Sequence, residues 1–161
     1  LMLISGLVYA QSFNSGSEPD GFRGVKWGQD VSTVDGLIYQ FSNGDNDFYF
    51  RSNDELKMGA AELNMITYVF WRDKFSGVML FADGSSNWKN LKAVVFAKFG
   101  KGYQENEYIE KYVWRGIKVG MVLKYNEFSE EGTFAMVSME ELFKQQKWEE
   151  EQNKKGVEEG W

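Results

Sequence analysis

Alternating apolar and polar positions run through most of the chain and predict antiparallel β-strands joined by tight turns. Two pairs of these runs are rich in aromatic and β-branched residues, which favour strands. Their turns are expected at Asp73-Lys74 and at Arg115-Gly116. The strands that the pattern predicts are 22–28, 37–41, 48–51, 62–72, 75–83, 108–114, 117–125 and 133–138.

Apolar residues recur at intervals of three or four between Trp88 and Phe99, which predicts a helix over 86–99. A second helix is expected over 140–154, and the charged side chains of its second half are expected to face solvent. Because hairpins rather than helices join most neighbouring strands, a parallel βαβ arrangement is disfavoured. The sequence therefore predicts an α+β fold, in which a mainly antiparallel sheet built from hairpins packs against these two helices.

The first ten residues are apolar and uncharged, like the end of an export signal. They finish on Val8-Tyr9-Ala10, a spacing of short residues that signal peptidase accepts, which predicts cleavage before Gln11. An N-terminal strand or the end of a membrane anchor is the alternative. We therefore expect residues 1–10 to be the remnant of an export signal and the protein to be exported, periplasmic or secreted.

The rest of the chain is expected to form one domain. Residues 11–21 are rich in Ser, Gly and Asn and predict a flexible lead-in. The α+β domain spans 22–155, which is long enough for a substantial core, and residues 156–161 form a tail. A helix of one or two turns is expected after Asp30, a favourable N-cap residue. No stretch after Ala10 is long and apolar enough to span a membrane.

The residue types that are missing from the chain limit the catalytic and metal-binding chemistry available to it. The 161-residue chain has no cysteine and no histidine, which excludes thiolate or imidazole metal sites and nucleophilic machinery of the Cys-His or Ser-His-Asp kind. Its formal net charge of −6, without a cluster of basic residues, argues against a nucleic-acid partner. We therefore predict no catalytic residues, no metal site and no cofactor, although chemistry based on carboxylates alone remains open.

The first aromatic hairpin provides the candidate binding site. A turn at Asp73-Lys74 directs one set of side chains to the core, namely Val69, Trp71, Val78 and Leu80. The opposite face is not polar, because it carries Tyr68, Phe70, Met79 and Phe81. Either a second layer covers these four side chains, or they form an exposed patch that binds a partner, since monomers rarely expose large apolar patches. These four residues are the predicted partner-binding site.

Glu110 and the segment 43–47 are two further candidates for a functional site, and each also has a structural explanation. Glu110 interrupts the otherwise apolar face of the second hairpin, where it can act as an acid or pair with a lysine or arginine. The segment 43–47, Asn-Gly-Asp-Asn-Asp, offers oxygen ligands for calcium but lacks the length and the distal glutamate of a calcium loop. A plain hairpin turn is favoured there.

The segment Phe22-Arg-Gly-Val-Lys-Trp-Gly28, followed by a short helix, resembles the opening of many small exported bacterial proteins of uncharacterised function. Those proteins similarly continue as hairpins, a helix after the middle of the sheet, further strands and a charged C-terminal tail. The resemblance covers the whole layout and implies an exported α+β domain. It brings no catalytic residues with it.

The preferred functional hypothesis is a non-catalytic exported module that binds a protein or another component of the cell envelope. One alternative is a hydrolase that uses carboxylates on envelope glycans, which requires two carboxylates facing each other across a cleft. A further alternative is a structural domain that associates with itself through a sheet edge or face, so that homo-oligomers stay open.

Overall fold

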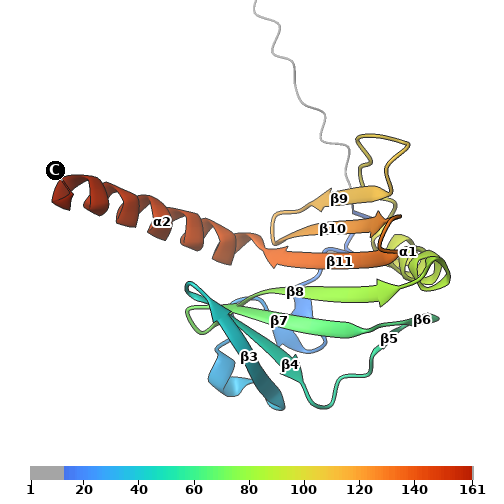
Figure 1. The fold of residues 1–161 in the computed structure, drawn as a ribbon, viewed down its shortest axis with the longest axis horizontal. Coiled ribbons are helices and arrows are strands. Elements are labelled where there is room, and N and C mark those ends of the chain that lie inside the picture. Colours follow the sequence, from blue (N-terminus) through green and yellow to red (C-terminus); the bar gives the residue numbers. More distant parts are fainter. Residues whose placement is uncertain (1–12, 161) are drawn as a thin grey trace, which may run out of the picture.

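The strands form one seven-stranded antiparallel sheet in the computed structural model, which describes residues 13–160 (Figure 1). The predicted export signal therefore lies outside the described residues. In spatial order the sheet contains β3 (Leu37–Asn43), β4 (Asn46–Arg51), β7 (Met65–Trp71), β8 (Lys74–Asp83), β11 (Glu131–Ser138), β10 (Val119–Asn126) and β9 (Lys111–Arg115).

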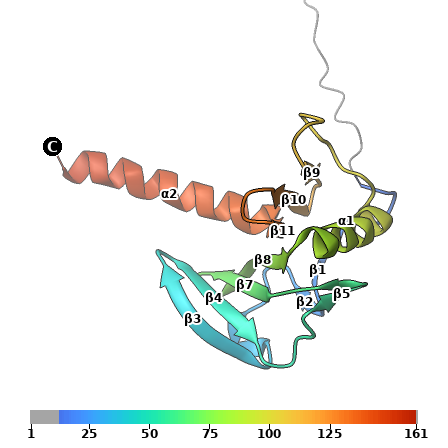
Figure 2. The same cartoon turned by 45° about the vertical axis from the view of Figure 1, so that its right-hand side comes forward.

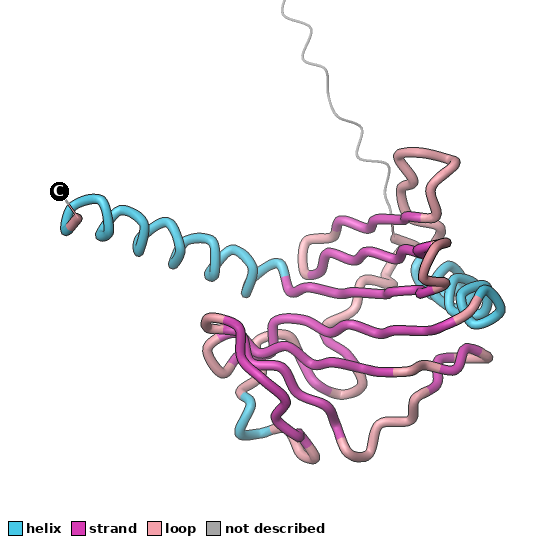
Figure 3. Tube along the Cα trace, viewed as in Figure 1, coloured by secondary structure: helices cyan, strands magenta, loops and turns pink. Residues whose placement is uncertain are grey.

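The remaining elements are two short hairpins and the helices. β1 (Gly21–Phe22) pairs with β2 (Val25–Lys26), and β5 (Lys57–Met58) pairs with β6 (Ala61–Glu62). The helices are the 3-10 helix η1 (Val31–Thr33), α1 (Ser85–Phe99) and α2 (Met139–Glu159). Short turns join β3 to β4, β7 to β8, β9 to β10 and β10 to β11 (Figure 3). The predicted α+β fold with a mainly antiparallel sheet is confirmed.

One face of the sheet is covered by α1 and by the segment that precedes β3 (Figure 2). From α1, Trp88 stacks on Tyr125 with ring centroids 5.3 Å apart. From the N-terminal segment, Trp27 stacks on Phe75 at 5.0 Å. We call this side the covered face; it holds the hydrophobic core, in which Leu80 and many of its neighbours have no exposed surface.

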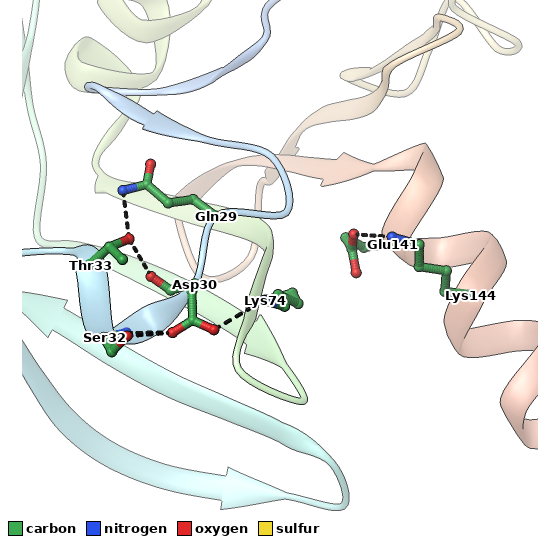
Figure 4. A network of polar contacts seen from close by, with 7 residues as sticks. All are labelled: Gln29, Asp30, Ser32, Thr33, Lys74, Glu141 and Lys144. Atoms are coloured by element: carbon green, nitrogen blue, oxygen red, sulfur yellow. Dashed lines mark hydrogen bonds and ion pairs between the residues drawn. The ribbon is translucent and has the colours of Figure 1, made fainter.

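The N-terminal segment is tied to the start of β8 at Asp30 (Figure 4). One carboxylate oxygen of Asp30 accepts hydrogen bonds from the hydroxyl of Ser32 at 2.6 Å and from its backbone N–H at 3.0 Å, which confirms the predicted N-cap. The other oxygen pairs with Lys74 at 3.0 Å. These hydrogen bonds, first those from Ser32 and then that from Lys74, lower the pKa of Asp30 to about 2.

The turn of the first aromatic hairpin lies one residue earlier than predicted. Arg72 and Asp73 form it, with φ of 46° and 68°. A β-bulge then shifts the register between Val69 and Phe70. Because a shift of one residue moves every side chain of a strand to the other face, the face assignment of β7 from the sequence is wrong.

The second aromatic hairpin also has a different turn, and its core face is as predicted only within β9 and β10. Tyr108 and Ile117, expected on that face, lie outside the strands and expose 86% and 91% of their surface. Tyr112 pairs with Leu123 rather than with Val119, which a two-residue turn at Arg115-Gly116 would place opposite it. The displacement along β10 is an even number of residues, so the same side chains still point to the core. Tyr112 and Leu123 are both buried.

Helix α2 begins where β11 ends and runs out past the ends of the neighbouring strands (Figure 1). The hydroxyl of Ser138 accepts a hydrogen bond from the backbone N–H of Glu141 at 3.3 Å and caps the helix. The predicted helix 140–154 continues to Glu159, so most of the segment assigned to a tail is helical. None of the described helices is long and apolar enough to cross a membrane.

Candidate functional site

The centre of the sheet face opposite α1 is largely apolar, and α2 contacts the sheet at the strand ends on this side. Residues that face each other across antiparallel strands point to the same side. On this side Phe48 pairs with Val69, and Met79 with Ala135. We call it the open face; its apolar members are Ile38, Phe41, Phe48, Phe50, Met65, Val69, Met79, Phe81, Val113, Val122, Ala135 and Val137.

The open face is separate from the hydrophobic core. None of its members belongs to the buried cluster or to the partly buried side chains that pack against that cluster. All of them are at least partly exposed, and Ile38 and Phe41 expose 49% and 54% of their surface. Because apolar sheet faces are normally buried against a second layer, and monomers rarely leave large ones uncovered, the open face is the main candidate site.

Charged side chains border the open face at the end of the sheet where α1 starts. Lys111 and Lys124 face each other across β9 and β10, and Asp83 and Glu131 face each other across β8 and β11. Like charges directly opposite each other are unfavourable within a sheet. An apolar centre with a border that carries both signs of charge is typical of protein–protein interfaces.

The structure separates the four residues of the predicted partner-binding site. Met79 and Phe81 lie on the open face and are partly exposed. Tyr68 and Phe70 lie on the covered face, and neither has any exposed surface. The Tyr68 hydroxyl also donates a hydrogen bond to the Asp54 carboxylate at 2.6 Å. The two aromatic residues are therefore core residues.

Sequence reasoning missed most of the open face. Val69 was assigned to the core, and Phe48, Ala135 and Val122 were assigned to no site. The alternation within β4, β10 and β11 was the available signal. It becomes informative only when the strands are placed side by side in register.

The two edges of the sheet differ. On the β9 edge, Tyr103 and Val113 exchange two backbone hydrogen bonds of 2.8 and 2.9 Å, so part of that edge is covered. On the other edge, no described strand pairs with the outer side of β3. β3 contains neither a charged residue nor a proline, which are common protections of an edge strand. The β3 edge can therefore accept an additional strand, and the bulge between Tyr39 and Phe41 is the one irregularity along it.

A cleft of about 540 Å³ lies at one corner of the open face, between α2 and the β3–β4 turn. Among residues 13–160, Trp71, at the end of β7, is the only lining residue outside these two elements. We call it the polar cleft because most of its other lining residues carry an amide or a carboxylate; they are Asn43, Gly44, Asp45, Asn46, Gln145, Trp148, Glu149, Gln152 and Asn153.

Arg72 joins the walls of the polar cleft. Its backbone N–H donates a hydrogen bond to the carbonyl oxygen of Asp45 at 3.0 Å, which ties the β7–β8 turn to the β3–β4 turn. Its guanidinium lies 4.0 Å from the ring centroid of Trp148 on α2, a stacking geometry that arginine favours. This side chain therefore makes one of the contacts between α2 and the sheet.

Glu110 pairs with a cation, which was one of its two predicted roles. Both of its carboxylate oxygens lie 3.0 Å from the ammonium of Lys92 on α1. The hydroxyl of Tyr112 donates a further hydrogen bond to Glu110 at 2.9 Å. These contacts give Glu110 a structural role between α1 and β9.

The same contacts lead to a prediction for alkaline pH. Burial, followed by the hydrogen bond to Glu110, raises the pKa of Tyr112 from its usual 10 to about 12. Because the fold favours the neutral phenol, stability is expected to fall as the pH rises from 10 towards 12. Absorbance of the phenolate should show a step near pH 12 that disappears in Tyr112→Phe. A titration unchanged by that substitution would contradict the assignment.

No group of three or more acidic side chains within residues 13–160 is arranged to hold a metal ion. The segment 43–47, considered for calcium, forms the β3–β4 turn and the adjoining strand ends. No protein-family model, curated protein or solved structure matches the chain. The open face and the polar cleft are therefore interpreted from their own geometry.

Proposed function

We propose that the chain is a non-catalytic, exported module that binds another protein of the cell envelope on its open face. The observation that supports this proposal is the set of apolar side chains on a sheet face that contributes nothing to the core. A partner that covers the open face removes these side chains from water, which is favourable by about 25 cal/mol for each Å² of apolar surface.

A protein fits the open face better than other classes of partner. Its border carries both lysines and acidic residues, whereas a surface that binds anionic lipid or nucleic acid is expected to be basic. The net charge of −6 disfavours both of those partners as well. The unpaired edge of β3 is continuous with the open face through Ile38 and Phe41, so a partner can cover the face and extend the sheet together.

Site-specific photocrosslinking in the native host tests the proposal. Benzoylphenylalanine in place of Phe41 is expected to crosslink this protein to one other protein of the exported fraction. In the crosslinked product, this protein itself is expected to start at or near Gln11. The matched control carries the same group in place of Phe143, an α2 residue that exposes 60% of its surface and is not part of the sheet. Capture of a second copy alone would instead favour the self-associating alternative, and equal labelling from both positions would contradict a specific site.

Two neighbouring positions of β8 separate binding from folding. Met79 lies on the open face and Val78 on the covered face, where Val78 is fully buried. Met79→Glu is expected to abolish crosslinking from position 41 while the domain stays folded, because Met79 is partly exposed and the new carboxylate stays in contact with water. Val78→Glu is expected to unfold the domain, since it buries an unpaired charge. Persistence of the crosslink in Met79→Glu would rule out the open face as the docking surface.

A further inference from the structure

We propose that the polar cleft between α2 and the β3–β4 turn binds a neutral oligosaccharide. This site is additional to the open face and does not depend on the protein partner proposed above. Its volume of about 540 Å³ lies within the usual range of small-ligand sites. The proposal rests on three properties of the cleft: the composition of its lining, an unsatisfied donor in its wall, and the way its walls are fixed.

The lining combines two indoles with many groups that both donate and accept hydrogen bonds. Trp148, which is partly exposed, supplies flat apolar surface, whereas Trp71 adds only the small part of its side chain that is not buried. The C–H groups on one side of a pyranose ring pack well on a flat apolar surface. Amides come from both walls of the cleft, for example from Asn46 and Gln152. A sugar hydroxyl donates to an amide or carboxylate oxygen and accepts from an amide N–H, so this lining matches a polyol.

Other classes of ligand match the lining less well. The described residues contribute no lysine or arginine to the cleft wall, while Asp45 and Glu149 both line it, so an anion is disfavoured. An apolar ligand would leave the amides without partners. A cation would compete with Arg72, which already stacks on the Trp148 ring at 4.0 Å.

Gln152 provides the second argument. Its side-chain nitrogen is buried, and no described residue gives it a hydrogen-bond acceptor. Buried amide donors are satisfied in the great majority of native structures. Gln152 belongs to the cleft lining, but neighbouring atoms cover its nitrogen. A ligand hydroxyl therefore accepts the missing hydrogen bond once the Gln152 side chain turns into the cleft.

The walls are fixed before a ligand arrives. Arg72 links the β3–β4 turn, through Asp45, to Trp148 on α2. The Gln145 amide also donates to the Glu149 carboxylate at 3.2 Å, which orients two lining side chains along one turn of α2. Walls that are already ordered reduce the entropy lost on binding. Arg72 is thus a positioning residue for the site.

Tryptophan fluorescence and isothermal calorimetry of the full chain test the proposal. The probes are the tetrasaccharides of N-acetylglucosamine, cellulose and maltose, with a sulfated heparin tetrasaccharide and spermidine as charged comparisons. Saturable binding is expected for at least one neutral probe and for neither charged one. No saturable signal from any neutral probe up to millimolar concentration, or binding of a charged probe alone, would overturn the proposal.

Variants then locate the bound sugar. Trp148→Ala and Gln152→Ala are each expected to weaken binding at least tenfold. Their matched controls are Phe143→Ala and Gln146→Ala, exposed residues of the same helix, and both are expected to leave binding unchanged. Gln152→Ala is also expected not to lower the melting temperature, because it removes an unsatisfied donor. Equal effects of a cleft variant and its control would refute the site.

Chromatography of the bound probe separates binding from catalysis. An oligosaccharide recovered intact after long incubation is the expected result, and it agrees with a non-catalytic protein. Cleavage that depends on Asp45 and Glu149 would refute a purely binding role for the cleft and would make the protein a glycan hydrolase, without bearing on the open face. These experiments can therefore reject sugar binding in the polar cleft without rejecting protein binding on the open face.

Discussion

Replacing Phe70 with alanine is expected to lower the free energy of unfolding by about 3–5 kcal/mol. Phe70 has no exposed surface and packs against Tyr49 and Phe75, each with ring centroids 5.3 Å away. Its removal leaves a cavity among side chains that are held by the sheet on one side and by the N-terminal segment on the other. Urea denaturation followed by circular dichroism measures the loss.

Phe41 provides the matched control for this substitution. It is also a strand phenylalanine, but it lies on the open face and exposes 54% of its surface. Phe41→Ala is expected to change the free energy of unfolding by less than about 1 kcal/mol. Similar losses of unfolding free energy in the two variants would contradict the assignment of Phe70 to the core, which follows from the register of β7.

Replacing Gly102 with alanine is expected to cost about 2–5 kcal/mol of stability. Gly102 has φ of +73°, and a Cβ there would lie 2.7–2.9 Å from ring atoms of Trp114. The indole cannot move aside easily, because Trp114 is fully buried and its N–H donates to the carbonyl oxygen of Gly100 at 3.2 Å. The expected cost combines roughly 1–2 kcal/mol for left-handed backbone with about 1–3 kcal/mol for overpacking.

Gly24 separates these two contributions. It has a similar φ of +82°, but no heavy atom lies within 4 Å of where its Cβ would be. Gly24→Ala is therefore expected to cost only the backbone contribution, about 1–2 kcal/mol. Thermal and urea denaturation of both variants give the difference, and a loss at Gly24 as large as that at Gly102 would contradict a steric role for Trp114.

The predicted binding site shows where the sequence is ambiguous. In the run from Met65 to Trp71 every residue except Thr67 is apolar or aromatic, so alternation does not say which side faces the core. The β-bulge between Val69 and Phe70 decides it. The turn alone does not, because it brings Phe70 opposite Phe75 in place of Arg72, an even displacement that leaves the faces unchanged. The result is that Tyr68 and Phe70 belong to the core, whereas Val69 belongs to the open face.

The polar cleft was beyond sequence reasoning for a different reason. Its walls come from segments about one hundred residues apart, the β3–β4 turn and α2. The charged second half of α2 predicted only a solvated helix, and the segment 43–47 predicted only a turn. Neither expectation predicts the contact of Arg72 with Trp148. That contact depends on the direction in which α2 leaves β11.

The sequence by itself determined α1, the start of α2 and the main hairpins of the large sheet. It did not determine the two short hairpins, because the strand expected over 22–28 is the β1–β2 hairpin and no strand was expected at β5. Apolar residues at helical spacing predicted α1, and alternation with short turns predicted the hairpins, because both patterns reflect local backbone geometry. It also determined the core face of β9 and β10, since an even displacement in register leaves side chains on the same side.

The tertiary structure alone decided which face of β7 is buried, which sheet face stays open, and which segments meet at the polar cleft. A single bulge between Val69 and Phe70 reversed the faces of β7. The bulge places Phe70 opposite Phe75 in the core, beneath the N-terminal segment. Such long-range contacts select among local conformations that differ by little free energy, and the residue pattern of one strand does not contain them.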